Sequence, residues 1–331
     1  MTKILFVCFL TPQIGIGHLS RLLAIAEILS KDKIITPEFI IFGNDFEKKE
    51  LKKYNTTFFS ESDEIDIAIN SVINRGDVSS VIFDFPSNFK SNKLEKLFKH
   101  LKIKKISLIG IDSLTEFHNF FDIIWIPSFH YDCSEFSGSK CIFKSGWDSF
   151  LLQKRLEPKD WSPGPKVLVL TGGSDMSKLN EHFPKELEKI SLGNIELNWV
   201  KGPFAEKPLI PRNSNHKWIV HDSPQNIDKL IVESSYVVTV FGVSFFEVLQ
   251  YGIPSVVFSP YDDKDKDELE ALKLEKVAIV ANDYKDASNG LIKIMSDHEK
   301  AIELSRNALQ KMSVNGAYSL SKEIYSLVNQ R

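Results

Sequence analysis

The sequence predicts an α/β protein with two Rossmann-like domains, each a doubly wound parallel sheet, facing a cleft. Short, continuously apolar segments alternate with amphipathic helical segments along the chain, as expected for parallel strands covered by helices on both faces. This alternation stops once, in the polar stretch 151–165, which contains three prolines and a glycine. The 331 residues, 43% of them hydrophobic, are sufficient for two cores of this kind.

The elements before this stretch begin with a buried strand. The opening MTKILFVCFL resembles a minimal signal peptide, but no small-x-small cleavage site follows, and an amphipathic helix comes next. We therefore expect a strand there, as part of a continuing βα pattern. Strands are expected at 3–10, 37–43, 78–84, 104–110 and 122–127, with helices at 18–31, 45–53, 62–74 and 91–102.

A second βα series follows the polar stretch and ends in two long helical segments. We expect an N-terminal domain over 1–150, a linker over 151–165 and a C-terminal domain over 166–331, with the last helix packing back on the N-terminal domain. Strands are expected near 166–171, 195–200, 216–220, 235–240, 254–258 and 277–280, and the closing helices at 285–311 and 317–330.

Composition argues against several classes of partner. The net charge of −3 gives no broad basic field for nucleic acid. No apolar segment approaches the roughly 18 residues of a membrane span. The three cysteines, Cys8, Cys133 and Cys141, form neither a disulfide framework nor a zinc-binding spacing. We expect a cytoplasmic protein without a metal or other cofactor; its oligomeric state does not follow from these features.

The segment GIGHLSR, residues 15–21, is the first candidate for chemistry. Gly15 and Gly17 permit a tight turn after the first strand and close approach of the backbone to a ligand. His18 then lies at a helix N-terminus, where anions are favoured, and Arg21 follows one turn later on the same face. An ordinary turn with a solvated histidine is the alternative. A dinucleotide fingerprint is weak, because Ser20 stands where its third glycine belongs.

Two glycine-containing loops in the second half follow the same logic. Gly172, Gly173 and Ser174 come after a strand and can hold a diphosphate through backbone N–H groups, although Ser174 or Asp175 could simply cap the next helix. Gly242 precedes another helix, in whose first turn Glu247 could bind ribose or only complement the helix dipole.

Two further residues stand at strand ends. His221 ends a strand in the second half, in a loop on which a base could pack. Asp84 ends the strand VIFD and could position a sugar hydroxyl or cap the segment that follows.

Together these segments resemble the UDP-sugar hydrolases of pseudaminic-acid synthesis and the related spore-coat polysaccharide G proteins. GIGHLSR matches the G-x-G-H-x-x-R of that family, LTGGSD its Gly-Gly-Ser-Asp loop, and FGVSFFEVLQYGIP its Gly-x-Ser-x-x-x-Glu…Gly-x-Pro element. FDFPS, GIDS and FKSGWDSFLL give weaker support. Phe245 replaces a small hydroxyl residue common in the family, and the usual Asn-Gln pair after the strand VVFSP is absent.

The resemblance implies the glycosyltransferase-B fold and a nucleotide-sugar ligand, most simply a UDP-sugar. His18 would be the catalytic base that activates water, and Gly15, Gly17, Arg21 and Asp84 would bind substrate. The nucleotide would be held by Gly172, Gly173, Ser174, His221, Gly242, Val243, Ser244, Phe245 and Glu247.

The expected activity is metal-independent cleavage of the anomeric C–O bond with inversion, releasing UDP and a free acetamido-deoxy sugar for surface-polysaccharide or nonulosonic-acid synthesis. The first alternative is an inverting glycosyltransferase, in which His18 activates an acceptor hydroxyl instead of water. The second alternative is a non-catalytic nucleotide-sugar binder. The sugar, the pathway and the nucleophile stay open.

Overall fold

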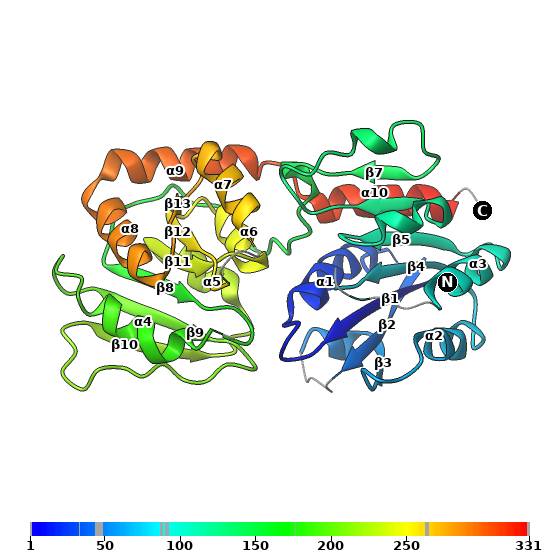
Figure 1. Cartoon of the computed structure of the whole chain (residues 1–331), viewed down its shortest axis with the longest axis horizontal. Coiled ribbons are helices and arrows are strands. Elements are labelled where there is room, and N and C mark those ends of the chain that lie inside the picture. Colours follow the sequence, from blue (N-terminus) through cyan, green and yellow to red (C-terminus); the bar gives the residue numbers. More distant parts are fainter. Residues whose placement is uncertain are drawn as a thin grey trace. The chain divides into compact units, whose positions relative to one another are not determined.

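The structure, a computed structural model, describes residues 2–32, 34–43, 49–86, 89, 93–175, 177–261 and 265–329. The chain divides into two compact units. Unit 1 comprises the residues up to Gln153 together with those from Val314 onward, and unit 2 spans Lys154–Ser313. Each unit is an α/β body with one parallel sheet between layers of helices (Figure 1).

The sheet of unit 1 has seven parallel strands in the order β3-β2-β1-β4-β5-β6-β7. The order reverses between β1 and β4, so the chain first adds strands on one side of β1 and then on the other. The strands are β1 (Thr2–Leu10), β2 (Ile35–Gly43), β3 (Asn55–Phe59), β4 (Val78–Asp84), β5 (Ser107–Ile111), β6 (Ile123–Trp125) and β7 (Ile142–Lys144).

Helices cover both faces of this sheet. Alternate residues of β1 point to opposite faces, and Leu5, Val7 and Phe9 join one core with residues of α2 (Ile65–Ile73) and α3 (Leu94–Ile103). On the other face α1 (Gly17–Leu29) packs beside α10 (Gly316–Asn329), although nearly 300 residues separate them, and Tyr325 donates from its hydroxyl to the Leu29 carbonyl at 3.3 Å. Short 3₁₀ helices lie at Leu51–Lys53, Thr115–Phe120, Ser134–Phe136 and Trp147–Ser149.

The sheet of unit 2 repeats this plan with six parallel strands in the order β10-β9-β8-β11-β12-β13, reversing between β8 and β11. Val167 and Val169 face a core completed by α4, α8 and α9, whereas Leu168 and Leu170 face α5 and α6. The strands are β8 (Lys166–Leu170), β9 (Glu196–Lys201), β10 (Lys217–Asp222), β11 (Tyr236–Val240), β12 (Ser255–Phe258) and β13 (Ile279–Val280). The helices are α4 (Leu179–Leu187), α5 (Ile227–Val232), α6 (Val243–Leu249), α7 (Lys266–Glu275), α8 (Tyr284–Ser296) and α9 (His298–Lys311).

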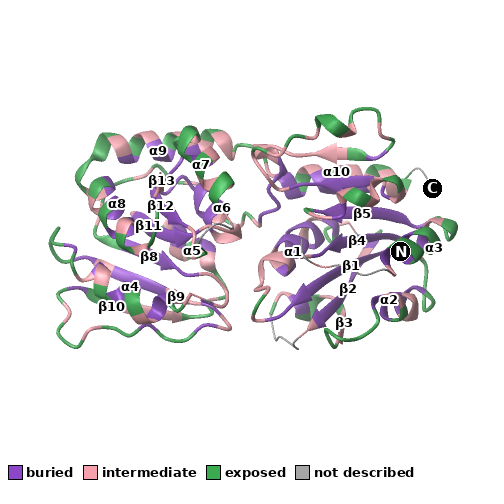
Figure 2. Cartoon of the chain, viewed as in Figure 1, coloured by how far each residue is buried: buried purple, intermediate pink, exposed green. Residues whose placement is uncertain are grey.

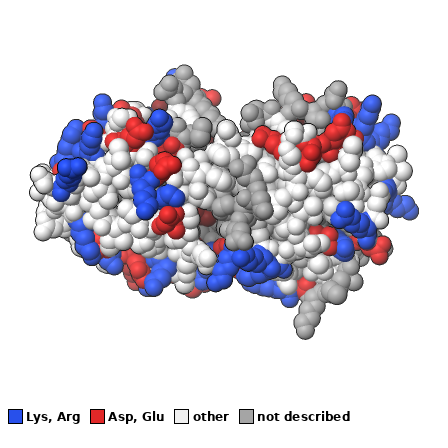
Figure 3. Space-filling model, turned by 90° about the horizontal axis from the view of Figure 1, so that it is seen from below, with Lys and Arg blue, Asp and Glu red and all other residues white. Residues whose placement is uncertain are grey.

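Burial follows the layers: the central strands of each sheet are buried, and the helices expose their outer faces (Figure 2). Acidic and basic side chains are interspersed on the face shown in Figure 3, in keeping with the small net charge. Among the described residues, no helix combines the length and apolarity needed to cross a membrane.

The predicted fold class is confirmed, because each half is a doubly wound parallel sheet. Several element predictions were wrong. The helix expected at 45–53 is a 3₁₀ turn over Leu51–Lys53 followed by β3, with residues 44–48 outside the described part of the chain. The single helix expected at 285–311 is α8 and α9, which part at Asp297, whose carboxylate accepts from Lys300 N–H. The edge strands β3 and β7 were missed.

Candidate active site

The side chains predicted in the first half converge where the strand order of unit 1 reverses. In open parallel sheets, ligands bind beyond the carboxyl ends of the strands at such a switch point. His18 follows β1 and Asp84 ends β4, and these two strands are hydrogen-bonded neighbours with Cys8 opposite Asp84. The sheet topology therefore brings together two residues that are 66 positions apart.

A tight turn connects β1 to α1. The amides of Ile14 and Gly15 donate to the Thr11 carbonyl, at 3.2 and 2.8 Å, and Gly15 adopts a left-handed φ of +77° that glycine tolerates without strain. Helix α1 begins at Gly17 without a side-chain cap. His18 is thus the second residue of the helix and lies beyond the carboxyl end of β1.

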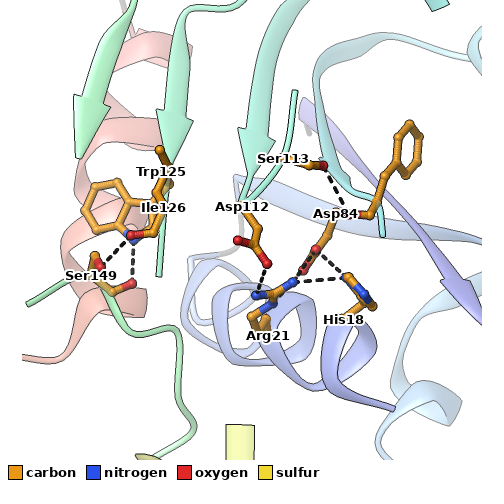
Figure 4. Close-up of polar contacts among 9 residues, drawn as sticks. His18, Arg21, Asp84, Asp112, Ser113, Trp125, Ile126 and Ser149 are labelled. Atoms are coloured by element: carbon orange, nitrogen blue, oxygen red, sulfur yellow. Dashed lines mark hydrogen bonds and ion pairs between the residues drawn. The ribbon is translucent and has the colours of Figure 1, made fainter. Parts of the chain in front are cut away.

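His18 is held by a buried carboxylate. Its Nδ1 lies 2.6 Å from Oδ1 of Asp84 (Figure 4). The Asp84 side chain is completely buried, whereas the His18 side chain is 15% exposed. No hydrogen bond engages Nε2 of His18 among the residues that the structure describes.

Arg21 ties this pair to a second carboxylate. Its Nε donates to Oδ2 of Asp84 at 3.0 Å, and its Nη2 donates to Oδ1 at 2.7 Å, which makes a bidentate pair. Its Nη1 donates to Oδ2 of Asp112 at 2.9 Å. These contacts occupy most of the guanidinium donors, so the geometry favours a role in holding Asp84 over the substrate contact expected for Arg21.

The charges in this cluster stabilise one another. Burial alone would raise the pKa of Asp84, but the Arg21 guanidinium and then His18 hold it below its usual value. Burial alone would lower the pKa of Arg21, but Asp84 and Asp112 hold it above its usual value. Asp84 is therefore an ionised carboxylate at neutral pH.

The state of Asp84 assigns the proton of the imidazole. An ionised carboxylate only accepts hydrogen bonds, so in the neutral ring Nδ1 carries the proton and donates it to Asp84. Arg21 Nη2 also lies 3.0 Å from Nδ1, but both atoms are donors in this tautomer, so this contact is not a hydrogen bond. Nε2 then holds a lone pair and can accept a proton.

Unit 2 places its first predicted loop beyond β8. Gly172 has a left-handed φ of +85°, and Asp175 accepts from the amides of Leu179 and Asn180 at 2.9 and 2.8 Å. Asp175 thus accepts from backbone N–H groups at the start of α4, which agrees with the capping role that was the alternative for this loop. Burial raises its pKa despite these two hydrogen bonds.

The carbonyl groups of Gly172 and Gly173 in this loop both point toward Gly202. A Cβ on Gly202 would lie 2.4 Å from the carbonyl oxygens of both Gly172 and Gly173, and the Gly173 carbonyl also accepts from Phe204 N–H at 3.0 Å. In a trans peptide the N–H points opposite to the C=O. The N–H groups of Gly173 and Ser174 therefore point away from Gly202, and neither donates to the backbone of another described residue. Successive outward N–H groups favour anions.

The second predicted loop of unit 2 follows β11, on the other side of the switch between β8 and β11. Gly242 has a φ of +150° and open space where a Cβ would lie. Val243 and Ser244 begin α6 and are partly exposed, and the partly exposed Glu247 lies in the second turn of α6 instead of the first.

Phe245 requires a correction. Its side chain is fully buried, and its ring packs against Phe246 with centroids 5.1 Å apart. Its N–H donates to the Gly242 carbonyl at 3.1 Å. Neither the ring nor the amide is available for the expected nucleotide contact. The residue packs in the core because it lies on the inner face of α6.

His221 lies on β10, the edge strand, away from the two loops at the switch point. Its Nε2 lies 2.9 Å from the amide oxygen of Asn198 on β9, so this nitrogen donates and Nδ1 accepts. Its expected contact with a base stays a prediction.

The sequence reasoning assigned no role to Asp112, which directly follows β5. The sequence feature that could have identified Asp112 is its place directly after β5, the strand next to β4. Among the described residues, no group of three or more His, Cys, Asp or Glu side chains is placed to hold a metal ion.

Comparison with known proteins bears on the fold. No protein-family model matches the chain, and no curated protein matches it. MurG of Acinetobacter baumannii is similar over 98% of this chain and 99% of its own, with 14% identity and a TM-score of 0.67. CalG4, the calicheamicin glycosyltransferase, is similar over 99% and 98%, with 11% identity and a TM-score of 0.64. The chain has the glycosyltransferase-B fold.

A third solved structure with this fold is a putative UDP-N-acetylglucosamine 2-epimerase from Listeria monocytogenes. It covers 99% of this chain and 97% of its own, with 12% identity and a TM-score of 0.63. Because all three identities are low, these likenesses establish the glycosyltransferase-B architecture of the chain and not its activity.

Proposed function

We propose that this protein is a glycosyltransferase that moves a sugar from a UDP-sugar to an acceptor hydroxyl, with His18 as the general base. The observation that carries the proposal is the pairing of His18 with Asp84. A buried carboxylate fixes the proton on Nδ1, and no described side chain hydrogen-bonds the other nitrogen. A base oriented by a carboxylate suits deprotonation of a hydroxyl as it attacks.

Unit 2 supports the nucleotide part of the proposal. The outward N–H groups of Gly173 and Ser174 suit the diphosphate of UDP, and the loop at Gly242 lies beyond the neighbouring strand. Val243, Ser244 and Glu247 follow that loop at the start of α6 and extend the proposed contacts toward the ribose. The ring of Phe245 is excluded from this set because it is fully buried.

The comparisons favour transfer over hydrolysis. CalG4 is a glycosyltransferase by name, and the Listeria protein is named for a UDP-sugar substrate. A specific observation keeps the hydrolase as the second candidate: the order G-x-G-H-x-x-R, Gly-Gly-Ser-Asp and Gly-x-Ser-x-x-x-Glu along the chain resembles the UDP-sugar hydrolases. In both reactions His18 would have the same task.

The proposed step is a direct displacement. The acceptor oxygen forms a bond to the anomeric carbon as its proton passes to Nε2 of His18. The bond from that carbon to the β-phosphate oxygen breaks, and the electron pair leaves with UDP. Asp84 stabilises the imidazolium that forms. The anomeric centre is inverted.

A UDP-release assay tests the proposal. The protein is incubated with UDP-glucose, UDP-galactose and UDP-N-acetylglucosamine, each with and without a panel of methyl glycosides and simple phenols as acceptors. Formation of UDP that requires an acceptor is the expected result. Formation of UDP and free sugar without acceptor would replace transfer by hydrolysis. UDP-sugar binding without turnover under any condition would contradict both.

His18→Ala is the matched variant. We expect its turnover to fall by about two to four orders of magnitude, with UDP affinity unchanged within about twofold, because the base is lost and the nucleotide contacts are not. His100→Ala, which removes an exposed histidine of α3, is the control and should behave as wild type. Wild-type turnover of His18→Ala would remove His18 from the mechanism.

A further inference from the structure

Asp112 contacts the same guanidinium as the proposed base and has an unusual backbone conformation. It follows β5, the strand next to β4, so its carboxylate is at the same edge of the sheet as Asp84. Its φ is +70°, in the left-handed region that few residues other than glycine, asparagine and aspartate adopt. Its N–H donates to the Trp125 carbonyl at 2.8 Å, which fixes this turn to the end of β6.

The turn is rigid because its neighbours are also held. Ser113 donates from its hydroxyl to the Phe85 carbonyl at 3.1 Å, and Trp125 donates from its indole to the Ser149 carbonyl at 2.7 Å (Figure 4). These bonds hold the residue that follows Asp112 and the residue whose carbonyl accepts from its N–H. The position of its carboxylate is therefore set by the fold and does not depend on a ligand.

The two carboxylates that bind Arg21 differ in exposure. Asp84 is completely buried and uses both oxygens, whereas the Asp112 side chain is 46% exposed and binds Arg21 through Oδ2 alone. Its other oxygen, Oδ1, has no hydrogen-bond partner within the described part of the chain. A pre-positioned acceptor thus faces solvent on the guanidinium that also lies against His18.

The charges of the cluster do not cancel. Arg21 carries one positive charge and Asp84 and Asp112 carry two negative charges, so with His18 in the neutral form that the proposed base requires, one negative charge is in excess. That excess lies on the exposed group, since Asp84 is buried and bidentate. The exposed Glu116, in the 3₁₀ turn that follows, has the same sign. At Asp112 this charge opposes anions and favours hydroxyl and ammonium groups.

The hydrogen bond from Arg21 would not by itself require a charged side chain at position 112. Asparagine tolerates the same left-handed backbone and could accept the Arg21 N–H through its amide oxygen. Asp84 already neutralises the guanidinium. What the carboxylate adds over asparagine is a negative charge that reaches solvent.

We infer that Asp112 selects the group brought to His18: Oδ1 accepts a hydrogen bond from a hydroxyl or ammonium of the sugar or acceptor, and its charge rejects carboxylate- and phosphate-bearing groups. This inference rests on the proposed function, of which it specifies the substrate class. The site then takes neutral or amino sugars in preference to acidic ones.

Three matched sugars test this inference without a nucleotide. Methyl glucoside, methyl 6-amino-6-deoxyglucoside and methyl glucuronide share one ring and differ at one carbon, which carries a hydroxyl, an ammonium or a carboxylate. Their affinities for the full chain are measured by saturation-transfer NMR at low ionic strength. We expect the amino sugar to bind about fivefold more tightly than the glucuronide, a modest ratio because Asp112 is half-exposed.

Asp112→Asn keeps the backbone preference and removes the charge, and thermal unfolding checks that it is folded. It should bind the amino sugar and the glucuronide equally, whereas Glu135→Gln, which removes an exposed carboxylate of unit 1, should keep the wild-type ratio. Tighter or equal binding of the glucuronide by wild type would overturn the inference, as would an unchanged ratio in Asp112→Asn or no binding of any sugar. Because no UDP-sugar turnover is measured, failure of the proposed function shows separately, in the UDP-release assay.

Discussion

Asp84→Asn is the substitution that tests the proposed site most directly. It keeps the shape of the side chain and removes its charge. The amide oxygen is expected at the position of Oδ1, because there it accepts from both His18 Nδ1, at 2.6 Å, and Arg21 Nη2, at 2.7 Å. The amide nitrogen then faces Arg21 Nε, which is also a donor, so one hydrogen bond is lost.

The stability cost follows from these contacts. Removing one partner of a buried ion pair costs about 3–5 kcal/mol. Arg21 keeps its bond to the half-exposed Asp112 at 2.9 Å, so we expect the free energy of unfolding to fall by about 2–3 kcal/mol. A domain with about 5–15 kcal/mol of stability stays folded after this loss.

The catalytic cost is electrostatic. The tautomer of His18 is retained, but the imidazolium that forms in the proposed step no longer faces a carboxylate, and the Arg21 guanidinium stays 3.0 Å from Nδ1. At about 4 Å between charge centres and an effective dielectric constant of about 20, the lost attraction is about 4 kcal/mol. We therefore expect kcat to fall by about two to three orders of magnitude, with the KM for the UDP-sugar little changed.

Two assays measure these effects on one preparation. Urea unfolding gives the change in stability, and UDP release gives kcat, with Glu135→Gln as the control expected to match wild type in both. A variant that unfolds within about 0.5 kcal/mol of wild type would refute the stability argument, and one that keeps more than a tenth of the wild-type kcat would refute the electrostatic argument.

Acid unfolding gives a third measurement on this residue. Because the pKa of folded Asp84 lies below its unfolded value, its contribution to stability is present above the unfolded pKa, about 4, and is lost as the pH falls through the lower folded pKa. We expect wild type to lose stability more steeply below pH 4 than Asp84→Asn. Parallel pH profiles of the two proteins would contradict the assigned charge.

Two further substitutions test unit 2. Gly202→Ala puts a Cβ 2.4 Å from the Gly173 carbonyl oxygen and should lower UDP affinity about tenfold in calorimetry, whereas Gly193→Ala, with open space at its Cβ, costs about 1 kcal/mol of backbone strain and leaves UDP binding intact. His216→Phe should leave the free energy of unfolding unchanged or raise it by about 1 kcal/mol, because His216 is 8% exposed and neither ring nitrogen has a hydrogen-bond partner among the described residues. His221→Phe, which loses the bond to its amide partner on β9, should instead lower it, and equal effects of the two histidine changes would contradict this reasoning.

The parts of the fold that were predictable are those with a strong hydrophobic pattern. β1 contains seven consecutive apolar residues and β4 the apolar segment VIF, as expected where both faces of a parallel sheet are covered. β3 and β7 are edge strands of five and three residues with little or no buried surface, so their pattern resembles that of a loop. The break at Asp297 was visible as a capping residue, but the apolar period continues across it.

The candidate site was predictable in its residues and not in its connections. His18, Arg21 and Asp84 were each found from their place after a strand or in the first turns of a helix. No local pattern shows that Arg21 is buried between two carboxylates, because that depends on β1, β4 and β5 being neighbours in the sheet. Local sequence also could not show that Phe245 faces the core, since its position on α6 depends on how the helix packs.

The binding of Arg21 between two carboxylates, which the sequence does not show, also determines which charge the site prefers in a ligand. Were Arg21 a substrate ligand, its charge would meet the ligand and the cluster would favour anions. Two carboxylates bind it instead, so its charge is used within the protein and the exposed charge has the opposite sign. Arg21, Asp84 and Asp112 would thus favour anions if Arg21 faced the ligand, and they disfavour anions when Arg21 is bound between the two carboxylates. Which case holds depends on β4 and β5 being adjacent in the sheet. For this reason we expect the preference for the amino sugar over the glucuronide, compared between wild type and Asp112→Asn, to be a sharper test than loss of activity. It tests directly whether the sheet binds Arg21 between two carboxylates.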